Sequence, residues 1–420
     1  MGDPGGGLRI LIVGAGVVGL ASALNLARRG HAVTVLDAGT GEGGCSYGNS
    51  GMIVPSHFTP LAAPGMVGMG LRYMADPESP FYVRPRPSLG LLLWGFRFWR
   101  AARKARVERA APLLRDLHLQ SRACYEEWAG SLEPFGLEKG GLLMLCRTEH
   151  GLAEERAVAG EAHRLGVPAE VLTEDGVREM EPSLTLDVKG GVYYPLDCFL
   201  DPGRLMSALR HAVQRLGVEL RLGLRVTGFE RRGDRIVGAR TKDGVLEADE
   251  HVLAAGMWSE GLAKGLGLSL PMQAGKGYSL TIEAPPEKPR HCAILVEGRV
   301  AVTPLGSGVR FGGTLELSGI DLEIDRARVR GIMRSVRAYL PAFKEEAFLG
   351  VAPWCGLRPC SPDGLPYLGR FKKYGNLSTA TGHAMMGVSL GPISGRLIAE
   401  ILAGETPSLD VSALNPDRYS

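Results

Sequence analysis

Near the N-terminus, three glycines with the spacing Gly14-x-Gly16-x-x-Gly19 follow an apolar segment and precede a run with helical spacing. In this pattern the first glycine makes a tight turn, the second lets the backbone approach a pyrophosphate, and the third lets a helix pack closely on a strand. The positive end of the helix dipole then faces the phosphates. Asp37 follows the motif at the distance where a carboxylate accepts hydrogen bonds from ribose hydroxyls. We therefore predict dinucleotide binding; a glycine-rich turn without a ligand is the alternative.

The acidic side chain of Asp37 disfavours a 2′-phosphate and therefore disfavours NADP. The motif by itself does not separate FAD from NAD. The loop from Cys45 to Met52 offers backbone amides, a hydroxyl and an amide side chain with little bulk. Such a loop suits a ribityl chain and the edge of a flavin ring, although an ordinary surface loop is the alternative.

Arg358 is a lone cation in the apolar, turn-rich segment that follows Trp354. A planar guanidinium holds a carboxylate through two parallel hydrogen bonds. Its alternative role is structural, as a donor to carbonyls or to a nearby aspartate. Further on, Gly387 precedes an apolar helical run, and amides at that helix start would stabilise negative charge on a ligand. The alternative there is a glycine-rich helix start without a ligand.

Two histidines, His57 and His383, lie beside these segments. Histidine titrates close to neutrality, so either residue suits a role in proton movement. The alternative for each is a hydrogen-bonded structural residue. The sequence contains no pattern typical of a Ser/His/Asp triad or of paired catalytic carboxylates. Since its cysteines show no metal-ligand spacing, we predict no metal site.

These residues require strands and helices to position them. Residues 9–13 read as a buried strand, 20–29 as a helix and 32–36 as a second strand, which together make a βαβ unit. Later helices are predicted at 89–111 (continuing to 128), 152–165, 203–216, 326–339 and 393–403. Later strands are predicted at 142–146, 191–194, 219–222, 225–230, 235–241, 244–248, 251–256, 301–303, 309–314 and 377–380. The mixture predicts an α/β fold.

Length and composition set limits on the protein class. A chain of 420 residues is too long for one compact core and suggests two domains. The net charge of +3 gives no electrostatic case for nucleic acid. Seven scattered cysteines argue against a disulfide framework, and the apolar run at 10–13 is too short for a signal peptide or a membrane span. We therefore expect a cytoplasmic protein.

Taken together, the motifs resemble the D-amino-acid oxidase superfamily of FAD-dependent oxidoreductases. The likeness is greatest to its bacterial D-amino-acid dehydrogenase branch, and glycine oxidase and glyphosate oxidoreductase are relatives. The resemblance covers nearly the whole chain. Its most specific parts are 13–19, 46–55, 60–65, 276–281, 356–369 and 382–387.

The resemblance implies a Rossmann-type FAD-binding domain of the D-amino-acid-oxidase kind and a second α+β substrate domain built on a mixed sheet. The cofactor domain would be discontinuous, with residues 1–55, 200–268 and 350–420. The substrate domain would comprise 56–199 and 269–349.

Positions carried over from the family imply a cofactor site. The ADP half would meet Gly14, Gly16, Gly19, Asp37, the backbone of Val226 and Gly256. The ribityl chain and flavin ring would meet Ser46, Asn49, Gly51 and Met52. The opposite edge of the ring would meet Gly382, His383, Gly387, Val388 and Ser389.

The same comparison implies the substrate site. Arg358 falls on the arginine that binds the substrate carboxylate in glycine oxidase and D-amino-acid oxidase, and Tyr278 and His57 complete the predicted catalytic set. In sarcosine oxidases a cysteine bonds covalently to the flavin, but that position here is Gly356, so we expect non-covalent FAD. The second arginine of glycine oxidase aligns with Met385, so a second carboxylate clamp is absent.

The family chemistry implies FAD-dependent oxidative deamination of a small amino acid, of the D-amino acid or D-proline and hydroxyproline type. Hydride would pass from Cα to flavin N5, and the electrons would go to a quinone or another acceptor. One alternative is an oxidase that passes electrons to O2 and acts on glycine, sarcosine or another N-substituted glycine. Alternatives of a different class are an NAD-linked dehydrogenase and a non-catalytic flavin-binding protein.

The segment 89–109 is rich in aromatic and basic residues. Since dehydrogenases of this kind feed the respiratory chain, it suggests peripheral contact with the inner face of a membrane. The alternative is an amphipathic helix packed on the substrate domain.

Overall fold

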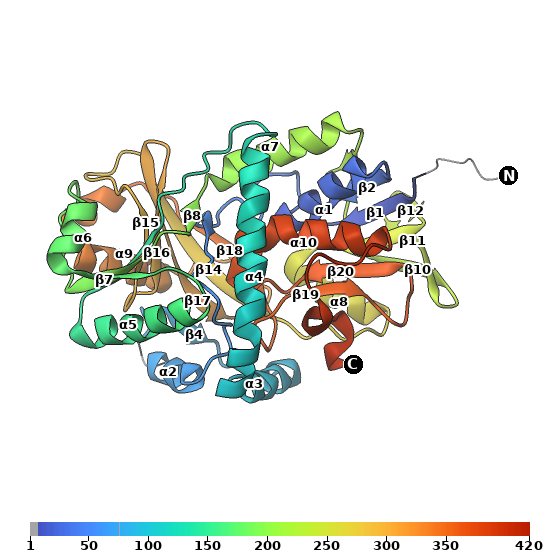
Figure 1. Cartoon of the computed structure of the whole chain (residues 1–420). Helices are drawn as coiled ribbons and strands as arrows, with labels where there is room; N and C mark the ends of the chain where they lie inside the picture. The colour runs from blue at the N-terminus through green and yellow to red at the C-terminus, as the bar shows by residue number, and fades with distance from the viewer. Residues whose placement is uncertain (1–6, 75) are drawn as a thin grey trace.

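The computed structural model describes residues 7–74 and 76–420, and two large β-sheets organise this part of the chain (Figure 1). The first sheet has the strand order β19-β20-β13-β1-β2-β9. Neighbouring strands pair in parallel except β19, which is antiparallel at one edge. The strands are β1 (Arg9–Val13), β2 (Ala32–Leu36), β9 (Glu219–Arg221), β13 (Glu250–Leu253), β19 (Tyr367–Arg370) and β20 (Leu377–Thr381).

Both faces of β1 are covered. Residues 10–13 are all buried, and successive side chains of a strand point to opposite faces. Ile10 and Ile12 pack with helices α1 (Val17–Arg28), α7 (Pro202–Arg215) and α10 (Gly387–Leu402). Leu11 and Val13 pack on the other side, against a helix and a small sheet. These elements are α8 (Ser259–Gly265), β10 (Gly228–Arg232), β11 (Arg235–Thr241) and β12 (Gly244–Glu247). β1 continues through α1 to β2 on one side, whereas β13 lies on the other side of β1, so a crevice opens at the carboxyl end of β1.

The second sheet is mixed and larger, with the order β18-β14-β17-β16-β15-β5-β7-β6, and β4 pairs with β17. Its pairs are antiparallel except β15 with β5 and β17 with β4, which are parallel. The strands are β4 (Phe81–Val83), β5 (Leu142–Cys146), β6 (Glu170–Thr173), β7 (Gly190–Tyr194), β14 (Gln273–Ile282), β15 (Cys292–Leu295), β16 (Val300–Leu305), β17 (Gly308–Leu317) and β18 (Trp354–Cys360).

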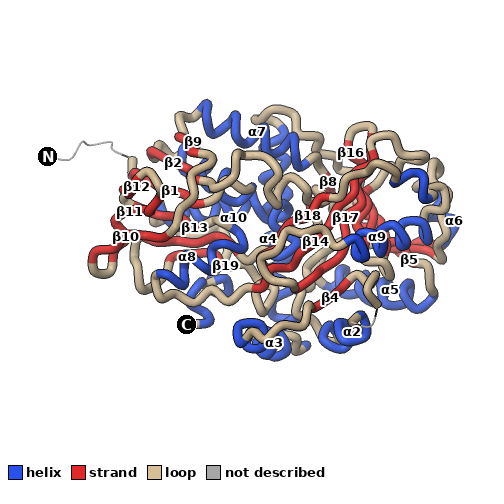
Figure 2. Tube along the Cα trace, turned by 180° about the vertical axis from the view of Figure 1, so that it is seen from behind, coloured by secondary structure: helices blue, strands red, loops and turns tan. Residues whose placement is uncertain are grey.

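Helices cover both faces of this larger sheet. α6 (Glu174–Met180) and α9 (Arg326–Tyr339) pack on one face, and α9 is seen in front of the strands in Figure 2. α5 (Glu149–Arg164) packs on the other face, near the short hairpin of β3 (Met52–Ile53) and β8 (Cys198–Phe199). α2 (Met66–Tyr73) and α3 (Leu89–Ala101) lie at the lower edge in Figure 1, and α4 (Lys104–Ala129) runs upright between the two sheets.

The predicted α/β class with a mixed second sheet is confirmed, and several element boundaries differ. The helix predicted across 89–111 breaks at residues 102–103 into α3 and α4. The last helix begins at Gly387, earlier than predicted, and contains Pro392. Proline cannot donate to the carbonyl four residues earlier; the Tyr125 hydroxyl donates to that carbonyl, of Val388, at 2.6 Å.

Two elements differ from the predicted domain division. β18, within the segment 350–420 assigned to the cofactor domain, pairs with β14 in the larger sheet. α4, within the segment assigned to the substrate domain, buries Leu114, Leu117 and Tyr125 against α1 and α10. The chain therefore passes between the two halves more often than the division implies.

One helical stretch, Ala384–Leu402, is long and apolar enough to cross a membrane. However, 72% of its most apolar window is buried inside the fold. It is therefore a core helix, packed on α1 and α4.

Candidate active site

The glycine turn between β1 and α1 is shaped by backbone contacts. Gly14 has φ +113°, and a Cβ there would lie 2.4 Å from the Ala254 carbonyl oxygen. A Cβ on Gly19 would lie 1.8 Å from the Gly14 carbonyl oxygen. By contrast, a Cβ on Gly16 would meet only the Ser46 hydroxyl, at 3.5 Å. The first and third glycines are therefore needed for packing, whereas the second faces open space.

Asp37 ends β2 beside this turn. Its carboxylate accepts from the N–H of Ala15 and from the N–H of Gly39, each at 2.7 Å. These bonds fix the carboxylate at the mouth of the crevice. The Ser46 hydroxyl accepts from the N–H of Val17, in the first turn of α1, so Ser46 lies beside the predicted pyrophosphate position.

A single cavity of about 1360 Å³ runs from the glycine turn to the larger sheet. It exceeds the usual range of about 300–1,000 Å³ for small-molecule sites, as a dinucleotide plus a substrate requires. It brings together most of the predicted site residues. Its lining includes Gly14, Gly16, Asp37, Ser46, Asn49, Met52, His57, Val226, Gly256, Tyr278, Arg358, His383, Gly387, Val388 and Ser389.

Three predicted residues do not line the cavity and act through the backbone. Gly19 lies against the Gly14 carbonyl, as described above. Gly51 has φ +73°, and a Cβ there would lie 2.2 Å from the Leu200 carbonyl oxygen. Gly382 has φ +79° and lies against the Tyr367 ring. They permit the turns that carry the lining residues.

Arg358 reaches the cavity from β18. Its guanidinium lies over Gly277 of β14, where a Cβ would lie 2.2 Å from Nη2. Nη1 donates to the carbonyl of Thr314, a residue with φ +67° at a bulge in β17. Among the described residues, no carboxylate lies within ion-pair distance of Arg358, and burial lowers the pKa of its guanidinium. The cavity wall therefore holds a half-buried cation without a counter-ion in the described part of the chain.

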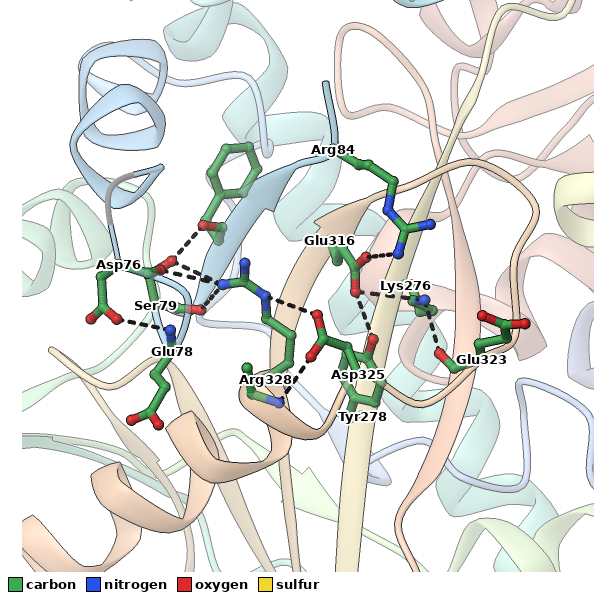
Figure 3. A network of polar contacts seen from close by, with 12 residues as sticks. Asp76, Glu78, Ser79, Arg84, Lys276, Tyr278, Glu316, Glu323, Asp325 and Arg328 are labelled. Atoms are coloured by element: carbon green, nitrogen blue, oxygen red, sulfur yellow. Dashed lines mark hydrogen bonds and ion pairs between the residues drawn. The ribbon is translucent and has the colours of Figure 1, made fainter. Parts of the chain in front are cut away.

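The hydroxyl of Tyr278 lies outside the catalytic site that was predicted for it. Its neighbour Gly277 faces Arg358, so the Tyr278 side chain points to the other face of β14 and packs with Val329 and Ile332 of α9. Its hydroxyl donates to the buried carboxylate of Glu316 at 2.6 Å (Figure 3). Tyr278 touches the cavity wall, but its hydroxyl belongs to a polar network behind the sheet.

The network in Figure 3 is a structural anchor. Lys276 is fully buried and donates to Asp321 at 2.8 Å, with Glu316 at 3.6 Å. On the same face, Arg328 donates to Ser79 and lies over the Tyr82 ring. These contacts attach the segment between α2 and α3 to the back of the strands that carry Arg358 and Thr314.

His57 lies in the cavity wall at the end of a buried polar chain. Its Nδ1 is 3.0 Å from the Ser56 hydroxyl, which donates to Asp197 at 2.5 Å. Burial lowers the pKa of His57 to about 4 and raises the pKa of Asp197 to about 7. Above neutrality, a neutral imidazole is therefore held by a carboxylate through one hydroxyl.

The other predicted histidine, His383, is a structural residue in this geometry. Its Nε2 is 2.9 Å from the Ser394 hydroxyl inside α10, and burial lowers its pKa to about 4.

Ser389 is also held by contacts within the protein. Its hydroxyl accepts from the N–H of Val54 at 3.0 Å and lies 2.8 Å from Nδ1 of His118. These bonds fix the start of α10 against the cavity.

Sequence reasoning missed three residues that shape the site. The Trp354 indole lies against Gly48 and Gly356, at positions where a Cβ on either glycine would collide with it. Arg310 donates to the carbonyls of Tyr47 and Asn49 and so holds the predicted flavin loop. His118 reaches Ser389 from α4. The small residues at 48 and 356 were the only local signal for Trp354.

The residues that line the cavity fit FAD. The positive end of α1 and the open space at Gly16 suit a pyrophosphate, and the carboxylate of Asp37 suits a ribose. At Gly256 and Gly387 an added Cβ would meet nothing within 4 Å, so the backbone there faces open space. The N-terminal end of α10, which begins at Gly387, points its positive dipole end at the cavity. A ring lying between the 45–52 loop and α10 would adjoin Arg358.

Comparison with known proteins agrees with this fit. A family model described as DAO, FAD dependent oxidoreductase, matches residues 9–401. The chain is 33% identical to a D-amino acid dehydrogenase of Granulibacter bethesdensis over 98% of this chain and 100% of that protein. It is also 33% identical to the protein of the same name from Bradyrhizobium diazoefficiens, over 98% and 99%.

Two solved structures resemble the fold over nearly their whole length. Glycine oxidase from Geobacillus kaustophilus has a TM-score of 0.79 at 25% identity, covering 98% of this chain and 100% of that one. L-proline dehydrogenase from P. horikoshii has a TM-score of 0.72 at 20% identity, covering 99% and 98%. The second likeness concerns the fold alone.

Proposed function

The chain belongs to the DAO family of FAD-dependent oxidoreductases, and from this we propose that it oxidises the Cα–N bond of a free D-amino acid. The product is an imino acid, which water hydrolyses to a 2-oxo acid and ammonia when the amine is primary. Bound FAD supplies the two-electron acceptor. The observation that carries the proposal is Arg358, a half-buried cation that has no counter-ion among the described residues and lines the cavity that also holds the dinucleotide motif.

Arg358 binds the substrate carboxylate and thereby decides which face of Cα meets the cofactor. Thr314 orients the guanidinium by accepting from Nη1. The choice of the D enantiomer is supported by the relatives at 33% identity, which are named D-amino acid dehydrogenases.

The proton that leaves the substrate ammonium passes through His57 and Ser56 to Asp197, whose pKa is raised by burial to about 7. Ser56 donates to Asp197 and therefore accepts from Nδ1–H of His57, which leaves Nε2 with its lone pair. The ring is neutral near pH 7 because burial lowers its pKa to about 4. His57 is thus a neutral acceptor in the cavity wall.

The electrons pass to a quinone or a similar acceptor rather than to O2. The names of the relatives at 33% identity support a dehydrogenase, whereas the likeness to glycine oxidase supports an O2-using enzyme. An assay in air separates the two: a dehydrogenase reduces an added dye or quinone and makes little peroxide. Stoichiometric peroxide without added acceptor would favour the oxidase.

The test of the activity is anaerobic mixing of the FAD-loaded protein with matched D- and L-amino acids. We expect D-amino acids to bleach the flavin absorbance and yield the 2-oxo acid with ammonia. Bleaching by the L series alone would reverse the enantiomer. No bleaching by any amino acid would refute the proposed activity and support a flavin-binding protein without this chemistry.

The outer face of α3 binds an anionic membrane surface on the cytoplasmic side. Leu89 is 72% exposed, and Phe96 and Trp99 are each 54% exposed. Arg100 lies over the Phe96 ring and Arg103 follows the helix, so cations border the apolar face. Exposed apolar side chains bordered by cations are typical of interfacial helices. The seven cysteines are free thiols, which suits a cytoplasmic location.

Co-sedimentation with vesicles tests this surface. The protein should pellet with anionic vesicles and much less with zwitterionic ones, and salt should weaken the binding. Leu89→Asp with Phe96→Asp should abolish pelleting, whereas Val245→Asp, at an exposed valine of β12, should not. Equal pelleting of all variants would refute the surface.

A further inference from the structure

The inner face of α3 forms part of the cavity wall. Leu91, Trp94, Gly95 and Phe98 all line the cavity, and their spacing of three and four residues places them on one side of the helix. The Ser88 hydroxyl caps the helix by accepting from the N–H of Leu91. The wall is therefore a regular helix face rather than a loop.

This helix face is attached to the strand that carries Arg358. The indole Nε1 of Trp94 donates to the carbonyl of Cys360 at 2.9 Å, and the Trp94 ring stacks on Phe98 with centroids 5.0 Å apart. Cys360 lies two residues beyond Arg358 on β18. The remaining members of this apolar cluster are Leu61, Phe81, Val83, Leu315, Leu317 and Ala384.

Charged groups lie elsewhere in the cavity. Asp37, Glu42 and Arg225 line the end that holds the dinucleotide motif, whereas Glu154, Glu155 and Arg299 line the end near α5. Arg299 directly precedes β16, three strands from β18, and its guanidinium contacts the sulfur of Met69 on α2. Arg358, two residues from the Cys360 carbonyl that accepts from Trp94, is the charged lining residue on the strand attached to α3.

We propose that the α3 compartment binds the substrate side chain and selects amino acids with an apolar side chain larger than a methyl group. The inference rests on the proposed amino-acid oxidation, because it takes Arg358 as the carboxylate anchor. An apolar side chain gains free energy by burial there. A cationic side chain would be desolvated near Arg358 without a partner, and an anionic one would compete with the carboxylate for the same guanidinium.

Gly95 provides a sharp test of the compartment. It faces the cavity, and an added Cβ would meet nothing within 4 Å. A larger residue at this position can therefore fold, and its side chain would fill the space proposed for the substrate. Gly90 of the same helix is exposed and does not line the cavity, so it is the matched control position.

The first measurement needs no variant. The FAD-loaded protein is mixed anaerobically with D-alanine, D-leucine, D-phenylalanine, D-lysine and D-glutamate, and the rate of flavin reduction is recorded against concentration. We expect the second-order rate constant to be at least about tenfold higher for D-leucine or D-phenylalanine than for D-alanine, since each apolar group bound is worth about tenfold or more. The two charged substrates should be slower than D-leucine.

The second measurement compares Gly95→Leu with Gly90→Leu. Gly95→Leu should lower the rate constant for D-phenylalanine at least about tenfold more than that for D-alanine, while Gly90→Leu leaves both unchanged. The FAD content and melting temperature of each variant establish that it is folded.

The outcomes separate this inference from the proposed function. Reduction by no amino acid would refute the oxidation itself. Reduction by D-alanine as fast as by D-leucine, or an equal loss for both substrates in Gly95→Leu, would overturn the compartment while leaving the oxidation standing.

Discussion

Arg358 carries a positive charge into a cavity wall where no described carboxylate faces it. We predict that Arg358→Leu raises the substrate KM by at least about a hundredfold, a loss on the order of 3 kcal/mol, since a hydrogen-bonded ion pair with the substrate is removed. Steady-state dye reduction measures KM. FAD content should stay the same, because Arg358 comes from the larger sheet. A change below about threefold would remove Arg358 from the site.

If His57 accepts the substrate proton, the effect of replacing it on kcat/KM should depend on pH. We expect His57→Phe to lower kcat/KM about a hundredfold near neutrality, because the acceptor for the substrate proton is lost. The deficit should shrink above the pKa of the substrate ammonium, where the amine arrives neutral. The measurement is the pH profile of kcat/KM for both proteins. A deficit that is constant with pH would instead indicate a purely structural residue.

The burial of His251 should make the free energy of unfolding depend on pH. His251 is buried in β13, where neither ring nitrogen has a hydrogen-bond partner among the described residues, and burial lowers its pKa from 6.5 to about 4. Between these values the unfolded chain binds a proton that the native protein does not, so native stability falls as pH decreases. His251 should contribute a slope of about 1.4 kcal/mol per pH unit there. Urea unfolding at pH 7 and pH 5 should show a smaller loss in His251→Leu than in the parent.

At the scale of elements, α1 and α10 meet at glycines. A Cβ on Gly395 would lie 2.4 Å from the backbone carbon of Ala21, so the two helices touch along their backbones. Both helices also present their N-terminal ends to the cavity. Their close approach therefore sets the relation between the pyrophosphate turn and the start of α10.

We predict that Gly395→Ala costs about 1–3 kcal/mol of unfolding free energy, because backbone atoms cannot yield to the added carbon. FAD affinity should weaken as the two helix ends separate. Urea unfolding and FAD titration measure the two effects. Gly261→Ala in α8, where an added Cβ meets nothing, is the control and should be neutral or slightly stabilising. An unchanged Gly395→Ala would contradict this account.

The helices and strands differ in how far the sequence could predict them. The β1–α1–β2 unit follows from local periodicity and turn chemistry. Arg358 and the 45–52 loop were candidates from their residue types, and the resemblance to the family implied their roles. The face on which Tyr278 lies was not predictable from the motif, because it depends on strand parity in β14. The start of α10 was hidden by Pro392, whose missing hydrogen bond is replaced by Tyr125 from a distant helix. Such long-range replacements leave no local pattern.

For the whole molecule, the cavity lies where both sheets meet, and its lining comes from segments throughout the chain. A ligand that fills it contributes to stability by mass action, about 2.7 kcal/mol at a hundredfold excess over its Kd. We predict that removing FAD lowers the melting temperature by about 3 °C. Adding FAD back should restore it, and ADP should restore only part. Identical melting of the two forms would contradict a site between the sheets.

The strand order has a consequence for dissection of the protein. β1 and β2 lie in one sheet, β4 to β7 in the other, β9 and β13 return to the first, β14 to β18 belong to the second, and β19 and β20 close the first. No single cut in the covalent chain can release either half. Protein nicked once by a protease should therefore migrate as one body on a native gel and separate into fragments only in denaturant. Shuffling this architecture with a relative would need several simultaneous junctions.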